Sequence, residues 1–485
     1  MKTESSKAGL SAGVKTGIHF IIMLTLYVFV STAEPLAPIT PAGMQMLAVF
    51  LFVLWGWMTI GFIFPSLAGI WLLGFNELIG HGGAFAGSFG NPVVAMMLFI
   101  FFLIKLLENN HVPEVIATWS MSRKFVQGRP MIYSLVVLLV TCLMGMVNMF
   151  LSILVMWAIM YGVFEKVGYK KHDTYVNVML IGIVMFSMMG LIIFPFVDNG
   201  LIIMSAYANI AGSPIPYGPY IITMIPVVIV LAIAWLLVGK YILRMDMSKI
   251  KNVDNSVLNM SLLNVTKQQV ASMIIIVVFI LSLLCQNFIP KDIPVLGMIP
   301  QSNVFVSIVI CFAIGALWHI DGKPVMEFNK LAGGIVWDSW CLTAFVLLLT
   351  AQLTGPDTGI TAFCVQVVQP LLGGLGVYAL VVVVMIFAFI VTNVCNNIVV
   401  TLCVLPIMFA LSQTMGFDIQ PVAMVIMMAS HFALLTPAAS GPAALMFGNT
   451  GWLSKGDIYK VVPLQLISAL LVVLTIGYAW ANMVF

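Results

Sequence analysis

The stretch VTNVCNNIVVTLCVLPIMFAL, from Val391 to Leu411, decides what kind of fold the chain adopts. It is as apolar as a membrane-spanning helix, yet it contains three asparagines, Asn393, Asn396 and Asn397. In a bilayer, every amide that lacks a hydrogen-bond partner carries a large energetic cost. The stretch therefore predicts a membrane segment whose amides either join neighbouring helices or line a binding site.

The composition of the whole chain indicates a membrane protein. Its 485 residues are 62% hydrophobic and 8% charged, with a mean hydropathy of +1.13. Soluble domains carry about 25% charged residues, which excludes a soluble fold. Apolar runs close to the spanning length of about 20 residues recur along the chain, so we expect an all-α polytopic membrane protein. The 7 cysteines show no metal-like spacing, and the net charge of +3 gives no indication of nucleic-acid binding.

The distribution of basic residues predicts the orientation in the membrane. With a cytoplasmic N-terminus, the inner loops hold all of the 20 Lys and Arg residues except Lys105 and Lys291. The C-terminus is then external. The polar stretch 244–269 is the clearest interruption of the apolar pattern, and the same asymmetry assigns it to the cytoplasm.

The two halves on either side of this linker resemble each other weakly. Each has an asparagine early in an apolar segment, Asn148 in the first and Asn397 in the second. Each is followed by an unusual interruption, FPFVDNG at 194–200 and TPAASGP at 436–442. Matched broken segments are typical of inverted-repeat transporters, although short apolar strings also align by chance.

We predict the following organisation. Residues 1–43 form an N-terminal segment and the first transmembrane helix, 44–243 a first inverted repeat with an inward hairpin near 132–164, 244–269 a cytoplasmic linker, 270–300 a connecting transmembrane helix, and 301–485 a second inverted repeat with an outward hairpin near 376–411.

The polar residues around the second hairpin are suited to binding a cation and an anion. Thr392, Asn396 and Asn397 lie close together, and an asparagine carbonyl can bind Na+ while its NH2 group reaches a carboxylate. The alternative is that these amides only join helices by hydrogen bonds. That alternative applies most directly to Asn393, which either belongs to the site or only fastens the hairpin to its neighbour.

A second candidate element is the interruption at 436–442. Its prolines and Gly441 break a helix, and its small residues, Ala439 and Ser440 among them, let a ligand approach the backbone closely. The alternative is a packing kink between helices.

Asp198 is the carboxylate that lies deepest in an apolar stretch, and such a residue is a candidate cation ligand or proton carrier. Its alternative role is local pairing with Asn199 beside a water-filled cavity. His431 is embedded in MMASHFALL and is expected to be a hydrogen-bonded core histidine.

These motifs resemble those of the divalent anion:sodium symporters in the ion transporter superfamily. That family carries a Ser-Asn-Thr signature at each hairpin tip, which runs into an apolar stretch ending in Leu-Pro-Ile. Here NNIVVTLCVLPI (396–407) places Asn397 on the signature asparagine, and Thr392 matches a position that helps bind sodium in the family. SGPAALMFGNTG (440–451) is similar to the Thr-Pro-Pro-Asn-Ala-Ile segment of the family.

The resemblance implies about 11 transmembrane helices plus two re-entrant hairpins in two inverted repeats. It also implies a homodimer of scaffold and transport domains with elevator-type motion, and no organic cofactor. The hairpin tips would bind a small organic anion through Asn148, Asn199, Asn396, Asn397, Ser440, Gly441 and Pro442, and Na+ through Asn148, Thr392, Asn397 and Ala439.

This sequence departs from the family pattern at several positions. The first signature reads Val147-Asn148-Met149, and in the second Asn396 and Ile398 stand in place of serine and threonine. The missing hydroxyls leave a dicarboxylate, a monocarboxylate or another small polar solute open as the substrate.

We expect secondary active transport of a small organic anion, coupled to Na+. One alternative is coupling to H+ through Asp198, and another is a membrane assembly or sensory protein that no longer transports. The sequence shows no acid-rich metal cluster and no Ser/His pair at a recognisable spacing, so we do not expect an enzyme.

Overall fold

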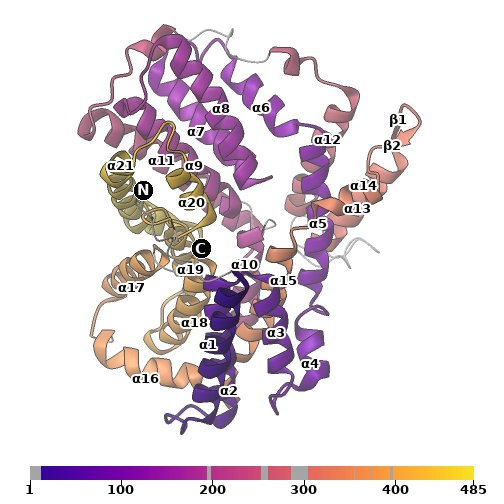
Figure 1. Ribbon diagram of the computed structural model, residues 1–485, viewed down its shortest axis with the longest axis vertical. Coiled ribbons are helices and arrows are strands. Elements are labelled where there is room, and N and C mark those ends of the chain that lie inside the picture. The colour runs from indigo at the N-terminus through magenta and orange to yellow at the C-terminus, as the bar shows by residue number, and fades with distance from the viewer. Residues whose placement is uncertain are drawn as a thin grey trace, which may run out of the picture. The chain divides into compact units, whose positions relative to one another are not determined.

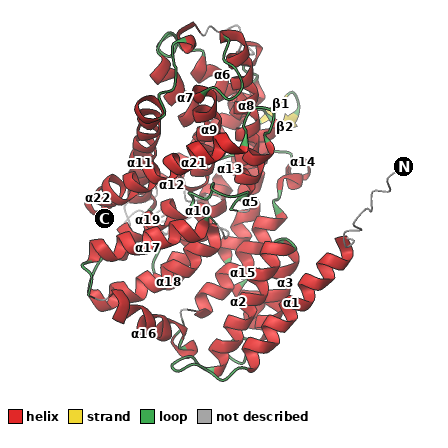
Figure 2. Ribbon diagram, turned by 60° about the vertical axis from the view of Figure 1, so that its left-hand side comes forward, coloured by secondary structure: helices red, strands yellow, loops and turns green. Residues whose placement is uncertain are grey.

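The computed structural model describes residues 12–193, 198–252, 260–285, 304–353, 355–372, 374–393, 397–437 and 439–485. Helices dominate this described part, and its strands are the short antiparallel pair β1 (His319–Ile320) and β2 (Lys323–Pro324) (Figure 2). Within it, 7 helices are long and apolar enough to cross a membrane, or up to 8 if one bent pair counts as a span. The prediction of an all-α polytopic membrane protein is confirmed.

The described part also holds shorter apolar helices of 10–17 residues. The chain separates into two compact units. One comprises residues 1–95 and 336–371, and the other comprises residues 96–335 and 372–485. The helix α5 (Pro92–Asn109) runs through the first boundary between them.

The first unit is built from helices near the N-terminus and a later insertion. Its elements are α1 (Ala12–Thr32), α2 (Pro41–Thr59), α3 (Ile63–Leu73), α4 (Gly80–Gly87), α15 (Trp337–Leu353), η8 (Pro356–Thr358) and α16 (Ile360–Leu372). The hydroxyl of Thr40 caps α2 by accepting from Gly43 N, and it also donates to the carbonyl of Asp357 at 2.8 Å. These contacts join the start of α2 to the loop before α16.

The second unit contains both predicted hairpins. Its elements are α6 (Val112–Met121), α7 (Pro130–Gly145), α8 (Met149–Val167), α9 (Thr174–Ile193), α10 (Asp198–Ala211), α11 (Tyr217–Leu237), η1 (Val238–Ile242), η2 (Lys249–Asn252), η4 (Met260–Leu263), α12 (Lys267–Cys285), α13 (Val304–Leu317), α14 (Phe328–Leu331), η7 (Ala332–Gly334), α17 (Val377–Thr392), α18 (Asn397–Met415), α19 (Ile419–Ser430), α20 (Gly441–Gly448), α21 (Lys455–Val472), η9 (Val473–Gly477) and α22 (Tyr478–Val484).

The centre of the second unit is α9, which is buried on every side from Tyr175 to Ile193. A helix that is apolar all round belongs in the core of its unit. The neighbouring helix α7 approaches it closely (Figure 1), because glycines face each other at the contact. A Cβ atom on Gly190 would lie 2.4 Å from the carbonyl oxygen of Cys142, and one on Gly145 would lie 2.3 Å from that of Ser187.

The helix pair α7 and α8 coincides with the hairpin predicted near 132–164. The helices are joined by residues 146–148, and Ser152 Oγ of α8 donates to the carbonyl of Thr141 in α7 at 2.7 Å. The pair α17 and α18 coincides with the hairpin predicted near 376–411 and flanks residues 394–396, which lie outside the described residues. Which side of the membrane each hairpin enters, and the repeat boundaries, stay predictions.

Candidate functional site

Asn393 connects the end of α17 to the chain beyond α19. Its side chain makes four hydrogen bonds and is 3% exposed. Nδ2 donates to the carbonyls of Phe389 and Phe432, and Oδ1 accepts from the backbone N–H groups of Leu434 and Leu435 at 3.1 and 2.8 Å. Both N–H donors of the amide and both acceptor positions of its oxygen are therefore used within the protein. The geometry agrees with the interpretation that Asn393 fastens the hairpin to its neighbour.

Residues 431–437 and 439–440, between α19 and α20, are not helical, which agrees with the break predicted at 436–442. Ser440 shapes the end of this segment, because its hydroxyl accepts from Ala443 N at the start of α20 and donates to the carbonyl of Ala433 at 2.7 Å. The backbone N–H groups of Leu434 and Leu435 donate to Asn393 Oδ1, and Leu434 is fully buried.

Three buried hydroxyl groups meet at the end of α19. Thr392 Oγ1 donates to the carbonyl of Ser430 at 2.5 Å, and Thr401 Oγ1 lies 2.5 Å from Ser430 Oγ. Thr401 Oγ1 is also 3.1 Å from the carbonyl of Asn397, the first residue of α18. Thr392, Thr401 and Ser430 are all 0% exposed. The cluster thus joins two of the predicted cation ligands, Thr392 and Asn397, through residues that sequence reasoning had not selected.

The other predicted ligands of the second half fall in three groups. Asn397 is 7% exposed and Ala439 is 1% exposed, so both lie in the interior of the unit. Pro442 is buried in the first turn of α20, whereas Gly441 is exposed at its start. Asn396 lies outside the described residues.

His431 is fully buried with Nδ1 2.8 Å from the carbonyl of Met427, as expected for a core histidine.

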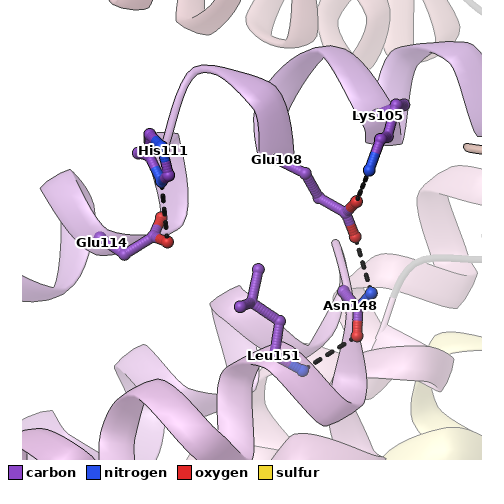
Figure 3. Close-up of polar contacts among 6 residues, drawn as sticks. All are labelled: Lys105, Glu108, His111, Glu114, Asn148 and Leu151. Atoms are coloured by element: carbon purple, nitrogen blue, oxygen red, sulfur yellow. Dashed lines mark hydrogen bonds and ion pairs between the residues drawn. The ribbon is translucent and has the colours of Figure 1, made fainter.

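Asn148 occupies the start of α8, at the tip of the first hairpin. Its Oδ1 accepts from Leu151 N at 3.0 Å and caps the helix, while its Nδ2 donates to Glu108 Oε1 at 2.6 Å. The other oxygen of Glu108 accepts from Lys105 Nζ at 3.1 Å (Figure 3). The predicted ligand Asn148 is therefore bound to a carboxylate from the end of α5.

Glu108 is a candidate site residue that sequence reasoning missed. A carboxylate that follows the apolar run 92–107 is a signal for function. It was not recognised because Asn109 and Asn110 come directly after it, which is the pattern of an ordinary helix end. Glu108 and Asn148 are 40 residues apart in the sequence, and the residues around Glu108 do not predict their contact.

The segment 431–441 lies against the first hairpin. A Cβ atom on Gly441 would be 2.8 Å from Cζ of Phe150, which is two residues after Asn148. Ser440 Oγ is 3.8 Å from Met188 Sδ of α9. The structure thus brings Ser440 and Gly441 beside the start of α8, as a site shared by both halves requires. Asp198 and Asn199 begin α10, but their side chains lie outside the described residues.

This architecture, a multi-pass helical protein with interrupted helices that carry buried polar groups, defines a membrane transporter. The citrate transporter family (CitMHS) matches residues 50–429, and the chain belongs to this family. An uncharacterized transporter of Haemophilus influenzae is 23% identical over 469 residues, which are 96% of this chain and 97% of that protein.

The fold is also similar to that of the Alcanivorax borkumensis YdaH transporter, a crystal structure described as having an unusual topology. The TM-score is 0.56 at 10% sequence identity, over 91% of this chain and 98% of that chain. At this identity the similarity concerns the fold alone. The expected transporter class is confirmed, and the finer assignment to the divalent anion:sodium symporters stays a prediction.

Proposed function

We propose that this protein is a Na+-coupled secondary transporter of a small carboxylate anion, and that citrate is the first substrate to test because the family is named for it. The observation that carries the proposal is the break between α19 and α20, where residues 431–437 and 439–440 are not helical and are held by the buried side chain of Asn393 and by Ser440. Unwound backbone inside a membrane protein is tolerated where it lines a cavity or binds an ion.

The residues near this segment are suited to Na+. A hard cation takes oxygen ligands, and the hydroxyl of Thr392 keeps lone pairs for a cation while it donates its proton to Ser430. Asn397 and the backbone around Ala439 complete the proposed cation ligands. The anion would bind near Asn148, Ser440 and Gly441, where α8 and the start of α20 come together.

The proposed cycle is elevator-type and takes place in a homodimer, as the family resemblance implies. Both interrupted segments belong to the same compact unit, which supports their moving as one body. The proposed activity involves no covalent chemistry and no organic cofactor.

The alternative proposal is H+ coupling. It is favoured by two carboxylates next to helix interruptions, Asp198 at the first residue of α10 and Glu108 beside Asn148. In that case Asp198→Asn is expected to make transport independent of pH or to abolish it.

The experiment is uptake of radiolabelled citrate into proteoliposomes at constant pH, with an inward gradient of either Na+ or K+. We expect uptake with Na+ and little with K+. Asn397→Ala should remove the Na+ dependence, because the proposed ligand is lost. Asn482→Ala is the control, since Asn482 is exposed and only donates to the carbonyl of Tyr478 in its own helix.

Three outcomes decide between the proposals. Equal uptake in Na+ and K+ that follows an imposed pH gradient supports the H+ alternative. Uptake that follows neither gradient argues against secondary transport of citrate, and the assay is then repeated with mono- and dicarboxylates. Full Na+-dependent activity in Asn397→Ala would remove Asn397 from the site.

A further inference from the structure

The tip of the first hairpin is held by a charged group from another helix. Asn148 Nδ2 donates to Glu108 Oε1 at 2.6 Å, and Lys105 Nζ donates to Glu108 Oε2 at 3.1 Å (Figure 3). The side chain of Glu108 is 17% exposed, and that of Lys105 is 30% exposed. One carboxylate is therefore shared between an ammonium group and the amide of a proposed site residue.

The contact fixes the direction of the Asn148 amide. Its two ends are identified by their partners, because a backbone N–H can only bond the oxygen and a carboxylate can only bond the NH2 group. The residues on either side, Val147 and Met149, have no polar side chain that could do the same. Hydrogen bonds to an ionised group are stronger than those between neutral groups. The bond to Glu108 is therefore the stronger of the two that hold the Asn148 side chain at the hairpin tip.

Few charged side chains lie near Glu108 among the described residues of α5, α6 and α8. Lys105 lies on the same helix, and its aliphatic stem packs against the backbone of Gly334, where a Cβ atom would be 2.5 Å from Lys105 Cβ. On α6, His111 and Glu114 are 3.3 Å apart and pair with each other (Figure 3). From α8, the partner of Glu108 is the neutral Asn148.

We infer that Glu108 is a positioning residue of the transport site, which fixes the first hairpin tip through the amide of Asn148. The inference rests on the proposed function for its effect on transport. Without the Glu108 carboxylate, Asn148 no longer presents the remaining hydrogen of its NH2 group in a fixed direction, so the anion binds less tightly.

The first test needs no substrate. Hydrogen–deuterium exchange of the full-length protein, followed by mass spectrometry, reports on the backbone amides at the start of α8, including the Leu151 N–H that Asn148 caps. In Glu108→Gln we expect exchange there to be about tenfold faster than in the wild type, corrected for the intrinsic rate.

Glu114→Gln is the matched control, because it removes a carboxylate from the same region that pairs with His111 and has no bond to Asn148. We expect it to leave exchange at the start of α8 unchanged. Equal exchange in Glu108→Gln and the wild type would overturn the inference, and so would an effect of Glu114→Gln as large as that of Glu108→Gln.

A second test exchanges the two partners. Asn148→Asp keeps a helix-capping oxygen but places a carboxylate against Glu108, and it should speed hydrogen exchange at the start of α8. Adding Glu108→Gln restores an amide–carboxylate pair across the same contact and should recover the protection from exchange. In Glu108→Gln alone, the KM for citrate should rise severalfold with a smaller change in kcat.

The two proposals fail in different ways. If the wild type takes up no carboxylate, the proposed function fails while the exchange experiment still tests the tie between Glu108 and Asn148. If citrate is transported but its KM is unchanged in Glu108→Gln and the double variant does not recover the protection from exchange, the positioning role of Glu108 fails alone.

Discussion

Asn393 shows how one buried amide can organise a break in a membrane protein. The non-helical segment after α19 exposes backbone groups that no lipid can satisfy. Asn393 bonds the carbonyl of Phe432 and the N–H groups of Leu434 and Leu435, so it satisfies part of this segment from the end of another helix.

Asn393→Ala should be among the most damaging single changes in the second hairpin. It leaves the N–H groups of Leu434 and Leu435 and the carbonyl of Phe432 without their partner, and we expect a loss of about 3 kcal/mol of stability. Thermal unfolding in detergent measures the loss. Asn393→Asp keeps the two acceptor bonds but turns a carboxylate oxygen towards the carbonyls of Phe389 and Phe432, so it should also be destabilised. Equal stability of the alanine variant and the wild type would contradict the organising role of this amide.

The sequence predicted these polar residues more successfully than it predicted their roles. Asn148, Asn393 and Asn397 were selected because amides are costly in an apolar segment. The partners of such residues could not be predicted, because only the tertiary fold brings them together. Glu108 is 40 residues away from Asn148, and Ser430 is 38 residues away from Thr392. Ser430 lies in the apolar stretch MMASHFALL and carries no pattern of its own.

Among the helices, the contact between α7 and α9 depends on glycine. Without a strong hydrophobic driving force inside a bilayer, helices associate through close packing of small residues. Gly145 and Gly190 allow the two backbones to approach, and a side chain on either would meet a carbonyl group. Because α8 packs on α9 and follows directly from α7, this contact also sets where Asn148 lies.

Gly190→Ala is expected to destabilise the protein by about 3 kcal/mol and to lower uptake, because the new methyl group would lie 2.4 Å from the Cys142 carbonyl oxygen. Gly17→Ala in α1 is the control, since nothing lies within 4 Å of its Cβ position and alanine favours a helix. Thermal unfolding of both variants provides the comparison. A Gly190→Ala variant as stable as Gly17→Ala would show that the two helices can separate without cost.

The interrupted elements were predictable because proline, glycine and amides in an apolar run have few structural uses. The helix break before α20 overlaps the predicted interruption 436–442, since residues 431–437 and 439–440 are not helical. The pairs α7–α8 and α17–α18 lie where the hairpins are predicted, and their re-entrant character stays a prediction. Contacts such as those of Asn393 with Phe432 join segments about 40 residues apart and have no local sequence pattern.

In the whole molecule, the match to the citrate transporter family over residues 50–429 reaches into both compact units. The polar groups of the proposed site belong to the second unit, including Glu108, Asn148, Thr392 and Ser440. An elevator-type mechanism would require these groups to keep their mutual contacts while they move across the membrane. The bonds among Thr392, Ser430 and Thr401, all buried, are of the kind that such a rigid body needs.

The orientation of the chain gives a prediction that tests the whole topology. All of the 20 Lys and Arg residues except Lys105 and Lys291 lie in loops or near helix ends that the proposed topology places inside, so we expect a cytoplasmic N-terminus and an external C-terminus. Alkaline phosphatase fused after Phe485 in a bacterial inner membrane should be active, and a fluorescent protein fused there should be dark. The same reporters placed at Ser248, in the polar linker, should give the opposite result. If both sites report the cytoplasm, one span has been miscounted between them, and the assignment of inward and outward hairpins has to be revised with it.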